Sequence, residues 1–130
     1  MSTSSSPSEL LQAAAEVAQL AGRKAMRWYR TGVDVETKSD GSPVTIADRE
    51  AERVARAWLS ERFPDDSILG EEFGVERPEA RRRWLIDPLC GTLNFAATTP
   101  LMVVNVALLD GERTIAAAAA DPVAQETPCY

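Results

Sequence analysis

The 130-residue chain carries 14 Lys and Arg against 20 Asp and Glu, a net charge of −6, and 45% of its residues are apolar. This composition excludes a wholly disordered chain and a disulfide-rich scaffold, and the acidic balance disfavours nucleic-acid binding outside a local basic patch. The chain has no histidine, which excludes a Ser-His-Asp triad and a histidine-based zinc site.

The first predicted element is a long helix that follows a Ser/Thr-rich stretch, residues 1–5, which we expect to be disordered. Ser6, Pro7 and Glu9 supply a helix N-cap, a proline at the first helical position and a capping-box acid. Apolar residues then recur at spacings of three and four, which predicts an amphipathic helix to about Arg30. Its predicted buried face is Leu10, Ala14, Val17, Ala21, Ala25 and Trp28.

A second helix is predicted after residues 33–43, whose Asp, Gly and Pro suggest a strand followed by a turn or open loop. Thr45 can cap this helix, with Asp48 near its third position, and Pro64 stops it. The predicted buried face of this helix is Ala47, Ala51, Val54, Ala55, Trp58 and Leu59.

Two short apolar runs predict strands that each lead into an acidic residue. Residues 68–70 run into Glu71, and residues 84–86, which have a buried-strand pattern, run into Asp87. Residues 76–83 between them are highly charged, which favours a solvated loop or short helix over a phosphate-binding patch.

The last predicted elements form a hairpin. Residues 101–109 and 114–120 are apolar and flank Asp110-Gly111, a strong hairpin signal. The alanines of the second run also favour a helix, but its short length between the turn and Pro122 favours a strand. Two helices followed mostly by strands predict an α+β fold, with the helices packed on one face of a mostly antiparallel sheet.

The cysteines, Cys90 and Cys129, do not form a spaced metal motif. Two cysteines in a chain of this size favour free thiols in a cytoplasmic protein, while a disulfide stays open. The first residues lack a basic and apolar leader, and the longest apolar run, residues 101–109, is too short to span a bilayer as a helix. We therefore expect a soluble, cytoplasmic protein.

Acidic residues at the ends of predicted elements are the first candidates for chemistry. Asp48 lies in the first turn of a helix. Glu71 and Glu72 follow one predicted strand, and Asp87 follows another. Carboxylates that converge from such ends offer the hard oxygen ligands that Mg²⁺ prefers. Each also has an ordinary alternative: interaction with the helix dipole for Asp48, and solvated loop or turn positions for the other three.

The segment after these acids offers a candidate anion site. Gly91 permits close approach of a backbone, and Thr92 can cap a short helix whose first N–H groups face outward. A helix N-terminus of this kind suits a phosphate group. Residues 91–95 are therefore a candidate phosphate-binding segment.

Residues 84–95, WLIDPLCGTLNF, resemble the W-x-I-D-P-[ILV]-D-G-T-x-N-F signature of the inositol monophosphatase family, which are Mg²⁺-dependent, lithium-sensitive phosphatases. Residues 43–48 resemble the family's V-T-x-x-D helix start, and residues 68–72 resemble its G-E-E strand end. Residues 100–122 are similar to the hairpin that follows in the family. The motifs occur in the family's order, and the resemblance covers about residues 8–126.

The resemblance implies a phosphomonoesterase with two metal sites. By position, Glu71, Asp87 and the backbone carbonyl of Leu89 would hold the first Mg²⁺, and Asp87 would bridge to a second. Cys90 stands where the signature has an aspartate ligand of the second metal. A neutral thiol is a poor partner for Mg²⁺, so we expect a weakened second site, which Zn²⁺ or Mn²⁺ would only partly restore.

The same resemblance implies roles around the reacting phosphate. Thr92, supported by Asp48 and Glu71, would orient the attacking water, and the N–H groups of Gly91 and Thr92 would hold the phosphate. Lys38 matches a basic position in an active-site loop of the family. This chemistry requires no histidine, because metal ions can neutralise charge on the transferring phosphoryl group.

The length departs from the family, whose members continue into a C-terminal half with a W-D-x-A-A motif. That half supplies another metal ligand and most substrate contacts, and no such motif occurs in this chain. We expect residues 6–130 to form the N-terminal, metal-binding half of the family's layered α/β sandwich, without the C-terminal half.

These features predict Mg²⁺-dependent hydrolysis of a small phosphate monoester, impaired by Cys90 and by the missing half. The alternatives are a 3′(2′),5′-bisphosphate nucleotidase-like phosphatase, or a non-catalytic metal- or phosphate-binding or interaction protein, as a pseudo-enzyme or fragment. The expected partner is a small phosphorylated metabolite, with no nucleic acid and no membrane. A half-fold would expose an apolar sheet face and edge, which predicts a homo-oligomer.

Overall fold

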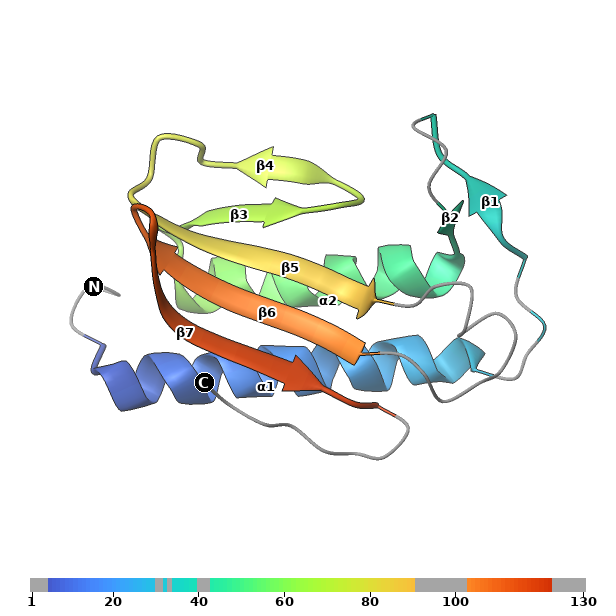
Figure 1. Cartoon of the computed structure of the whole chain (residues 1–130), viewed down its shortest axis with the longest axis horizontal. Helices are drawn as coiled ribbons and strands as arrows, with labels where there is room; N and C mark the ends of the chain where they lie inside the picture. Colours follow the sequence, from blue (N-terminus) through green and yellow to red (C-terminus); the bar gives the residue numbers. More distant parts are fainter. Residues whose placement is uncertain (1–4, 30–31, 33, 40–42, 91–102, 123–130) are drawn as a thin grey trace.

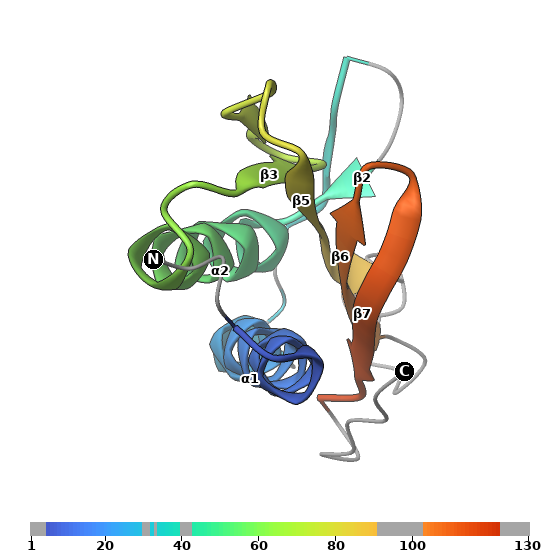
Figure 2. The ribbon, with the colours of Figure 1, turned by 90° about the vertical axis from the view of Figure 1, so that its left-hand side faces the viewer.

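Two helices lie on one face of a five-stranded sheet, which is the α+β arrangement that the sequence predicts. The computed structural model describes residues 5–29, 32, 34–39, 43–90 and 103–122. Figure 1 shows the sheet in front of both helices, and Figure 2 shows that the helices share one side of it. The other face of the sheet carries no described helix.

Helix α1, Pro7–Ala25, begins with the predicted capping box. The Ser6 hydroxyl accepts a hydrogen bond from the Glu9 N–H at 3.2 Å, and the Glu9 carboxylate accepts one from the Ser6 N–H at 2.9 Å. These hydrogen bonds lower the pKa of Glu9. The α-helix ends five residues before the predicted Arg30, because the chain tightens into a 3₁₀ turn, η2 (Met26–Trp28).

Helix α2, Ile46–Arg62, begins at the predicted N-cap, Thr45. Four of its six predicted core residues are buried, whereas Val54 and Trp58 are half-buried. The buried face also contains two charged residues that the sequence pattern does not identify, Glu52 and Arg56. The confirmed core positions are Ala47, Ala51, Ala55 and Leu59.

The main sheet has the strand order β4-β3-β5-β6-β7, and β1 and β2 form a separate two-stranded hairpin. In the main sheet, β3 and β5 are parallel and every other neighbouring pair is antiparallel, so the sheet is mostly antiparallel as predicted. The strands are β1 (Glu36–Thr37), β2 (Pro43–Val44), β3 (Ser67–Gly70), β4 (Gly74–Glu76), β5 (Arg82–Cys90), β6 (Val103–Asp110) and β7 (Arg113–Ala120).

The predicted hairpin is formed by β6 and β7, which confirms that the alanine-rich run is a strand. Gly111 at the turn has a φ of 65°, a conformation that glycine adopts without steric cost. Burial then alternates along both strands, and the alanines of β7 that face inward meet helix α1. Small side chains on both elements allow this close contact; those of β7 are Ala116, Ala118 and Ala120.

The charged segment, residues 76–83, differs from the prediction of a loop or short helix, since Arg82 and Arg83 are the first residues of β5. Asp66 explains the difference, because its side chain is buried and its carboxylate accepts hydrogen bonds from Arg82 and from the Trp84 indole. The shortest of these joins Arg82 Nη2 to Asp66 Oδ2 at 2.7 Å. A paired arginine can therefore begin a buried strand.

The core lies between the two helices and the covered sheet face, with Trp84, Leu59 and Ile68 as its largest fully buried apolar side chains. Phe63 packs against Trp84, with ring centroids 5.2 Å apart in a tilted arrangement. No helix in the described part of the chain is long and apolar enough to cross a membrane.

We predict that Ile68→Ala lowers the free energy of unfolding by about 2–5 kcal/mol, because it leaves a cavity at a fully buried position. Ile46→Ala is the matched control, since Ile46 is 46% exposed on the first turn of α2. The control variant should change stability by less than about 0.5 kcal/mol. Urea denaturation followed by circular dichroism measures both values, and equal effects would contradict this assignment of the core.

Candidate active site

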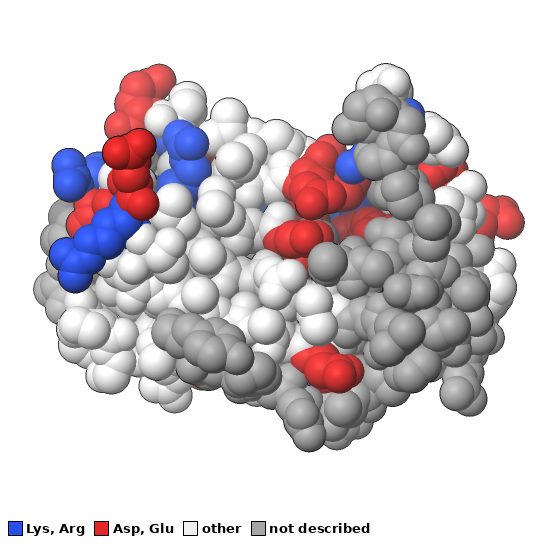
Figure 3. Space-filling view, in the orientation of Figure 1, with Lys and Arg blue, Asp and Glu red and all other residues white. Residues whose placement is uncertain are grey.

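The parallel pairing of β3 and β5 brings two predicted site residues to one edge of the sheet. Gly70 is paired with Ile86, so Glu71 and Asp87 follow at the same level. Asp87 was predicted to follow the strand, but β5 continues to Cys90 because Asp87 still pairs with Asn105 of β6. Both residues line a hollow of about 610 Å³ on the sheet face away from the helices. Figure 3 shows acidic side chains gathered at this end of the face, beside the β1–β2 hairpin.

Asn105 is a further polar residue of this hollow, and no sequence motif marks it as a candidate. It pairs with Asp87 across the β5–β6 ladder. The available signal was a polar residue at an outward position between Val104 and Val106, which are both buried. The remaining lining of the hollow is apolar or small and consists of Leu69, Gly70, Leu85, Ile86, Val106, Ala107, Ala117, Ala118 and Ala119.

Asp48 lies at the third position of α2, as predicted, and closes the capping box with Thr45. Its Oδ2 accepts hydrogen bonds from the Thr45 N–H at 2.6 Å and from the Thr45 hydroxyl at 2.8 Å. The residue is 3% exposed. Asp48 therefore has a structural role as the acid of the capping box, and its catalytic role stays a prediction.

Glu72 differs from its neighbour Glu71, because its side chain is only 6% exposed and forms an ion pair with Lys38. The Lys38 Nζ lies 3.3 Å from Glu72 Oε1 and 3.4 Å from Oε2. Burial raises the pKa of Glu72, and the nearby Lys38 opposes that shift. Lys38 follows β1, so this pair connects the β1–β2 hairpin to the acidic end of the sheet.

The remaining predicted residues lie at or beyond the end of β5. Leu89 and Cys90 belong to the strand, where the register with β6 shifts between Asp87 and Cys90. Gly91 and Thr92, predicted to bind phosphate and to orient water, lie outside the described residues.

The polar residues that line the hollow are Glu71, Asp87 and Asn105, whose side chains carry carboxylate and amide oxygens. Such donors fit Mg²⁺ in kind, because a hard cation prefers carboxylate and carbonyl oxygens. Within the described ranges, no group of three His, Cys, Asp or Glu side chains is close enough to hold a metal.

Fold and site together define an α+β protein with an acidic site where β3 ends beside Asp87 of β5. Residues 6–128 match the Inositol monophosphatase family. The match covers nearly the whole sequence, and the chain belongs to this family.

Relatives that match the chain include proteins named as histidinol-phosphatases and as inositol-1-monophosphatases. The chain is 43% identical over 99 residues to a histidinol-phosphatase of Chlorobaculum parvum, covering 75% of this chain and 38% of that protein. It is 36% identical over 122 residues to an inositol-1-monophosphatase of Mesorhizobium japonicum, covering 92% of this chain and 46% of that protein. The chain thus spans less than half the length of either relative.

Solved structures of similar proteins share the fold of this chain. The extragenic suppressor protein suhB from Bartonella henselae superposes with a TM-score of 0.86 at 28% identity. That superposition covers 93% of this chain and 48% of the suhB chain. The IMPase of Thermotoga maritima superposes with a TM-score of 0.85 at 28% identity, covering 93% and 47% of the two chains.

We predict that Thr45→Ala destabilises the protein by about 1 kcal/mol, because α2 loses its N-cap hydroxyl. The same change removes the hydroxyl donor to the Asp48 carboxylate. Thr45→Ser is the matched control, since serine keeps the hydroxyl and should remain within about 0.5 kcal/mol of the wild type. Urea denaturation distinguishes the two variants, and an equal loss in both would show that the threonine methyl matters instead.

Proposed function

We propose that this chain provides the metal-binding part of a Mg²⁺-dependent phosphomonoesterase. The observation that carries the proposal is the placement of Glu71 and Asp87 at the same level of two parallel strands, where both line one hollow. Membership of the inositol monophosphatase family supports the reaction class. Relatives named as phosphatases of inositol phosphate and histidinol phosphate are consistent with hydrolysis of a small phosphate ester.

The proposed roles follow the family's motifs at this chain's own residues. Glu71, Asp87 and the Leu89 carbonyl would hold Mg²⁺, which supplies charge neutralisation for the phosphoryl group when bound. Thr92 would orient the attacking water, with Asp48 and Glu71 accepting hydrogen bonds from the threonine–water pair. The N–H groups of Gly91 and Thr92 would hold the phosphate oxygens, and Lys38 adds positive charge beside this end of the sheet.

Two substrates deserve a direct comparison, because relatives of each name match the chain. The histidinol-phosphatases of Chlorobaculum parvum, Streptomyces coelicolor and Mycobacterium tuberculosis are 43%, 42% and 39% identical to it over their aligned regions. The inositol-1-monophosphatase of Mesorhizobium japonicum is 36% identical but aligns over more of the chain, 92%. We therefore propose a phosphorylated small alcohol, either an inositol phosphate or histidinol phosphate.

Because of Cys90, Mg²⁺ binding and phosphate hydrolysis must be measured separately in this protein. It replaces the aspartate of the family signature that would bind a second metal, and a thiol is a poor ligand for Mg²⁺. We propose one effective Mg²⁺ site with slow turnover, and the runner-up proposal is a non-catalytic protein that binds metal and phosphate. Cys90→Asp tests the difference, because it supplies the missing oxygen ligand.

We predict that Mg²⁺ raises the melting temperature of the wild-type protein, since a ligand that binds only the folded state stabilises it. Asp87→Asn and Glu71→Gln should each weaken Mg²⁺ binding at least tenfold, measured by isothermal titration calorimetry. Glu112→Gln is the matched control, because Glu112 is an exposed acid at the β6–β7 turn and does not line the hollow.

Phosphate release from inositol 1-phosphate and histidinol phosphate is measured in parallel, with Cys90→Asp expected to increase it. A wild-type protein that binds no Mg²⁺ would contradict the proposed function. Mg²⁺ binding without phosphate release, in both the wild type and Cys90→Asp, would favour the non-catalytic alternative.

We also propose that, where this half-fold occurs without a C-terminal half, its open sheet face pairs with a second copy of this chain. The face is apolar around the hollow, and Leu69 on it is 37% exposed. Leu69→Glu should shift the elution of the 14.1-kDa chain from dimer to monomer in size-exclusion chromatography with light scattering. Val35→Glu is the control, because Val35 is 40% exposed but does not line the hollow. A monomeric wild type would contradict this proposal.

A further inference from the structure

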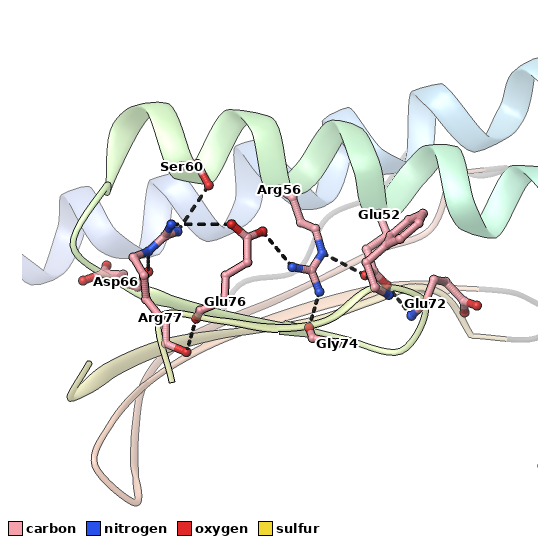
Figure 4. Close-up of polar contacts among 10 residues, drawn as sticks. Glu52, Arg56, Ser60, Asp66, Glu72, Gly74, Glu76 and Arg77 are labelled. Atoms are coloured by element: carbon pink, nitrogen blue, oxygen red, sulfur yellow. Dashed lines mark hydrogen bonds and ion pairs between the residues drawn. The ribbon is translucent and has the colours of Figure 1, made fainter. Parts of the chain in front are cut away.

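The turn that carries the acidic residues is attached to helix α2 through one buried carboxylate. Glu52 has no solvent exposure, although it lies on a helix and carries a charge. Its Oε1 accepts a hydrogen bond from the Glu72 N–H at 2.9 Å, and its Oε2 accepts one from the Phe73 N–H at 3.0 Å. Figure 4 shows the Glu52 side chain reaching from α2 to this backbone. Glu52 therefore satisfies the donors of the turn between β3 and β4.

Gly70 makes room for this carboxylate. A Cβ at position 70 would lie 2.4 Å from Glu52 Oε2 and 2.6 Å from Oε1, so a side chain there requires the Glu52 carboxylate to shift. Gly70 does not have a positive φ, so the glycine is needed for space and not for backbone conformation. The last residue of β3 and the carboxylate of Glu52 thus fit each other, immediately before Glu71.

Arg56, one helical turn after Glu52, balances the buried charge. Its Nε donates to Glu52 Oε2 at 2.9 Å, and its Nη1 donates to Glu76 Oε1 at 2.8 Å. Its Nη2 donates to the carbonyl oxygen of Gly74. Figure 4 shows these contacts along the β3–β4 hairpin. A buried carboxylate with three donors, one of them a cation, avoids the penalty of an unpaired buried charge.

Both backbone neighbours of Glu71 contact the Glu52 carboxylate. Gly70 before it is packed against the Glu52 carboxylate, and the Glu72 N–H after it is hydrogen-bonded to the same group. Asp48 lies one helical turn before Glu52 on α2, so a single helix holds one predicted site residue directly and another through its backbone. The position of the Glu71 carboxylate relative to Asp87 therefore depends on Glu52.

We propose that Glu52 is a positioning residue for the metal site: through the Glu72 and Phe73 N–H groups and the space at Gly70, it sets where the Glu71 carboxylate meets Mg²⁺. This inference rests on the proposed function, because it assigns Glu71 as a metal ligand. Outer groups that orient metal ligands typically change metal affinity by roughly 10–100-fold. A residue with only a structural role would lower stability without changing metal affinity in the folded protein.

Glu52→Gln tests the proposal, because glutamine keeps the size of the side chain but replaces one acceptor oxygen with a donor NH₂ group. We expect Mg²⁺ affinity, measured by calorimetry on the folded variant, to fall by about tenfold. We also expect the Glu72 and Phe73 amide protons to exchange at least ten times faster in NMR experiments, because their acceptor is disturbed. Glu50→Gln is the control on the same helix, where Glu50 pairs only with Arg53 among the contacts described, and it should leave both quantities unchanged.

Ile68→Val controls for lost stability, because it loosens the core without touching the turn, and it should leave Mg²⁺ affinity unchanged. Gly70→Ala is the second test, since its methyl group would displace the carboxylate while leaving Glu52 in place. If neither Glu52→Gln nor Gly70→Ala folds, the wild type still provides a test. Mg²⁺ should then slow exchange of the Glu72 and Phe73 amides, because the coupling between the two sites is reciprocal.

The outcomes separate the two proposals. Wild-type protein that binds Mg²⁺ with unchanged affinity in Glu52→Gln and Gly70→Ala would overturn the positioning role and leave the proposed function standing. Unchanged amide exchange on adding Mg²⁺ to the wild type would also overturn the positioning role. Wild-type protein that binds no Mg²⁺ would overturn the proposed function, and the positioning role with it.

Discussion

The parallel alignment of β3 with β5 is the constraint on which the candidate site depends. The parallel register pairs Gly70 with Ile86, so Glu71 and Asp87 lie at the same level although sixteen positions separate them in the sequence. The chain must then reverse at once, because β4 pairs antiparallel with β3 on its other side. That tight reversal leaves backbone N–H groups without partners in the ladder, and α2 supplies the acceptor. Sheet topology thus creates both the site and the need for a buried acid beneath it.

The elements set by local signals could be predicted from the sequence. The capping boxes at Ser6 and Thr45 fix where both helices begin, and Asp110-Gly111 fixes the hairpin. The charged residues that became buried could not be predicted in this way. Glu52 and Arg56 are spaced i, i+4, which is typical of an exposed helical ion pair, and their further partners lie about twenty residues away. Arg82 likewise pairs with Asp66 sixteen positions earlier.

The sequence motifs likewise locate only part of the candidate site. The family motifs identify Glu71 and Asp87, and the structure places both on one hollow. They do not reveal that Glu72 is nearly buried against Lys38, because this pair depends on how the β1–β2 hairpin meets the sheet. Asn105 was missed for a related reason: a single polar residue in an apolar run gains meaning only when strand register places it opposite Asp87.

The alanine contact between β7 and α1 has a consequence for how this fold can change over time. Where Trp84 and Leu59 fill the core, harmful substitutions are those that remove atoms. Where Ala118 and Ala18 are buried, the side chains are already small, so few atoms can be lost. Destabilising substitutions there are those that add atoms and increase the distance between α1 and the sheet. The two ends of the core therefore tolerate opposite kinds of variation. Sequence drift along β7 is limited by backbone proximity, whereas drift along β5 is limited by volume.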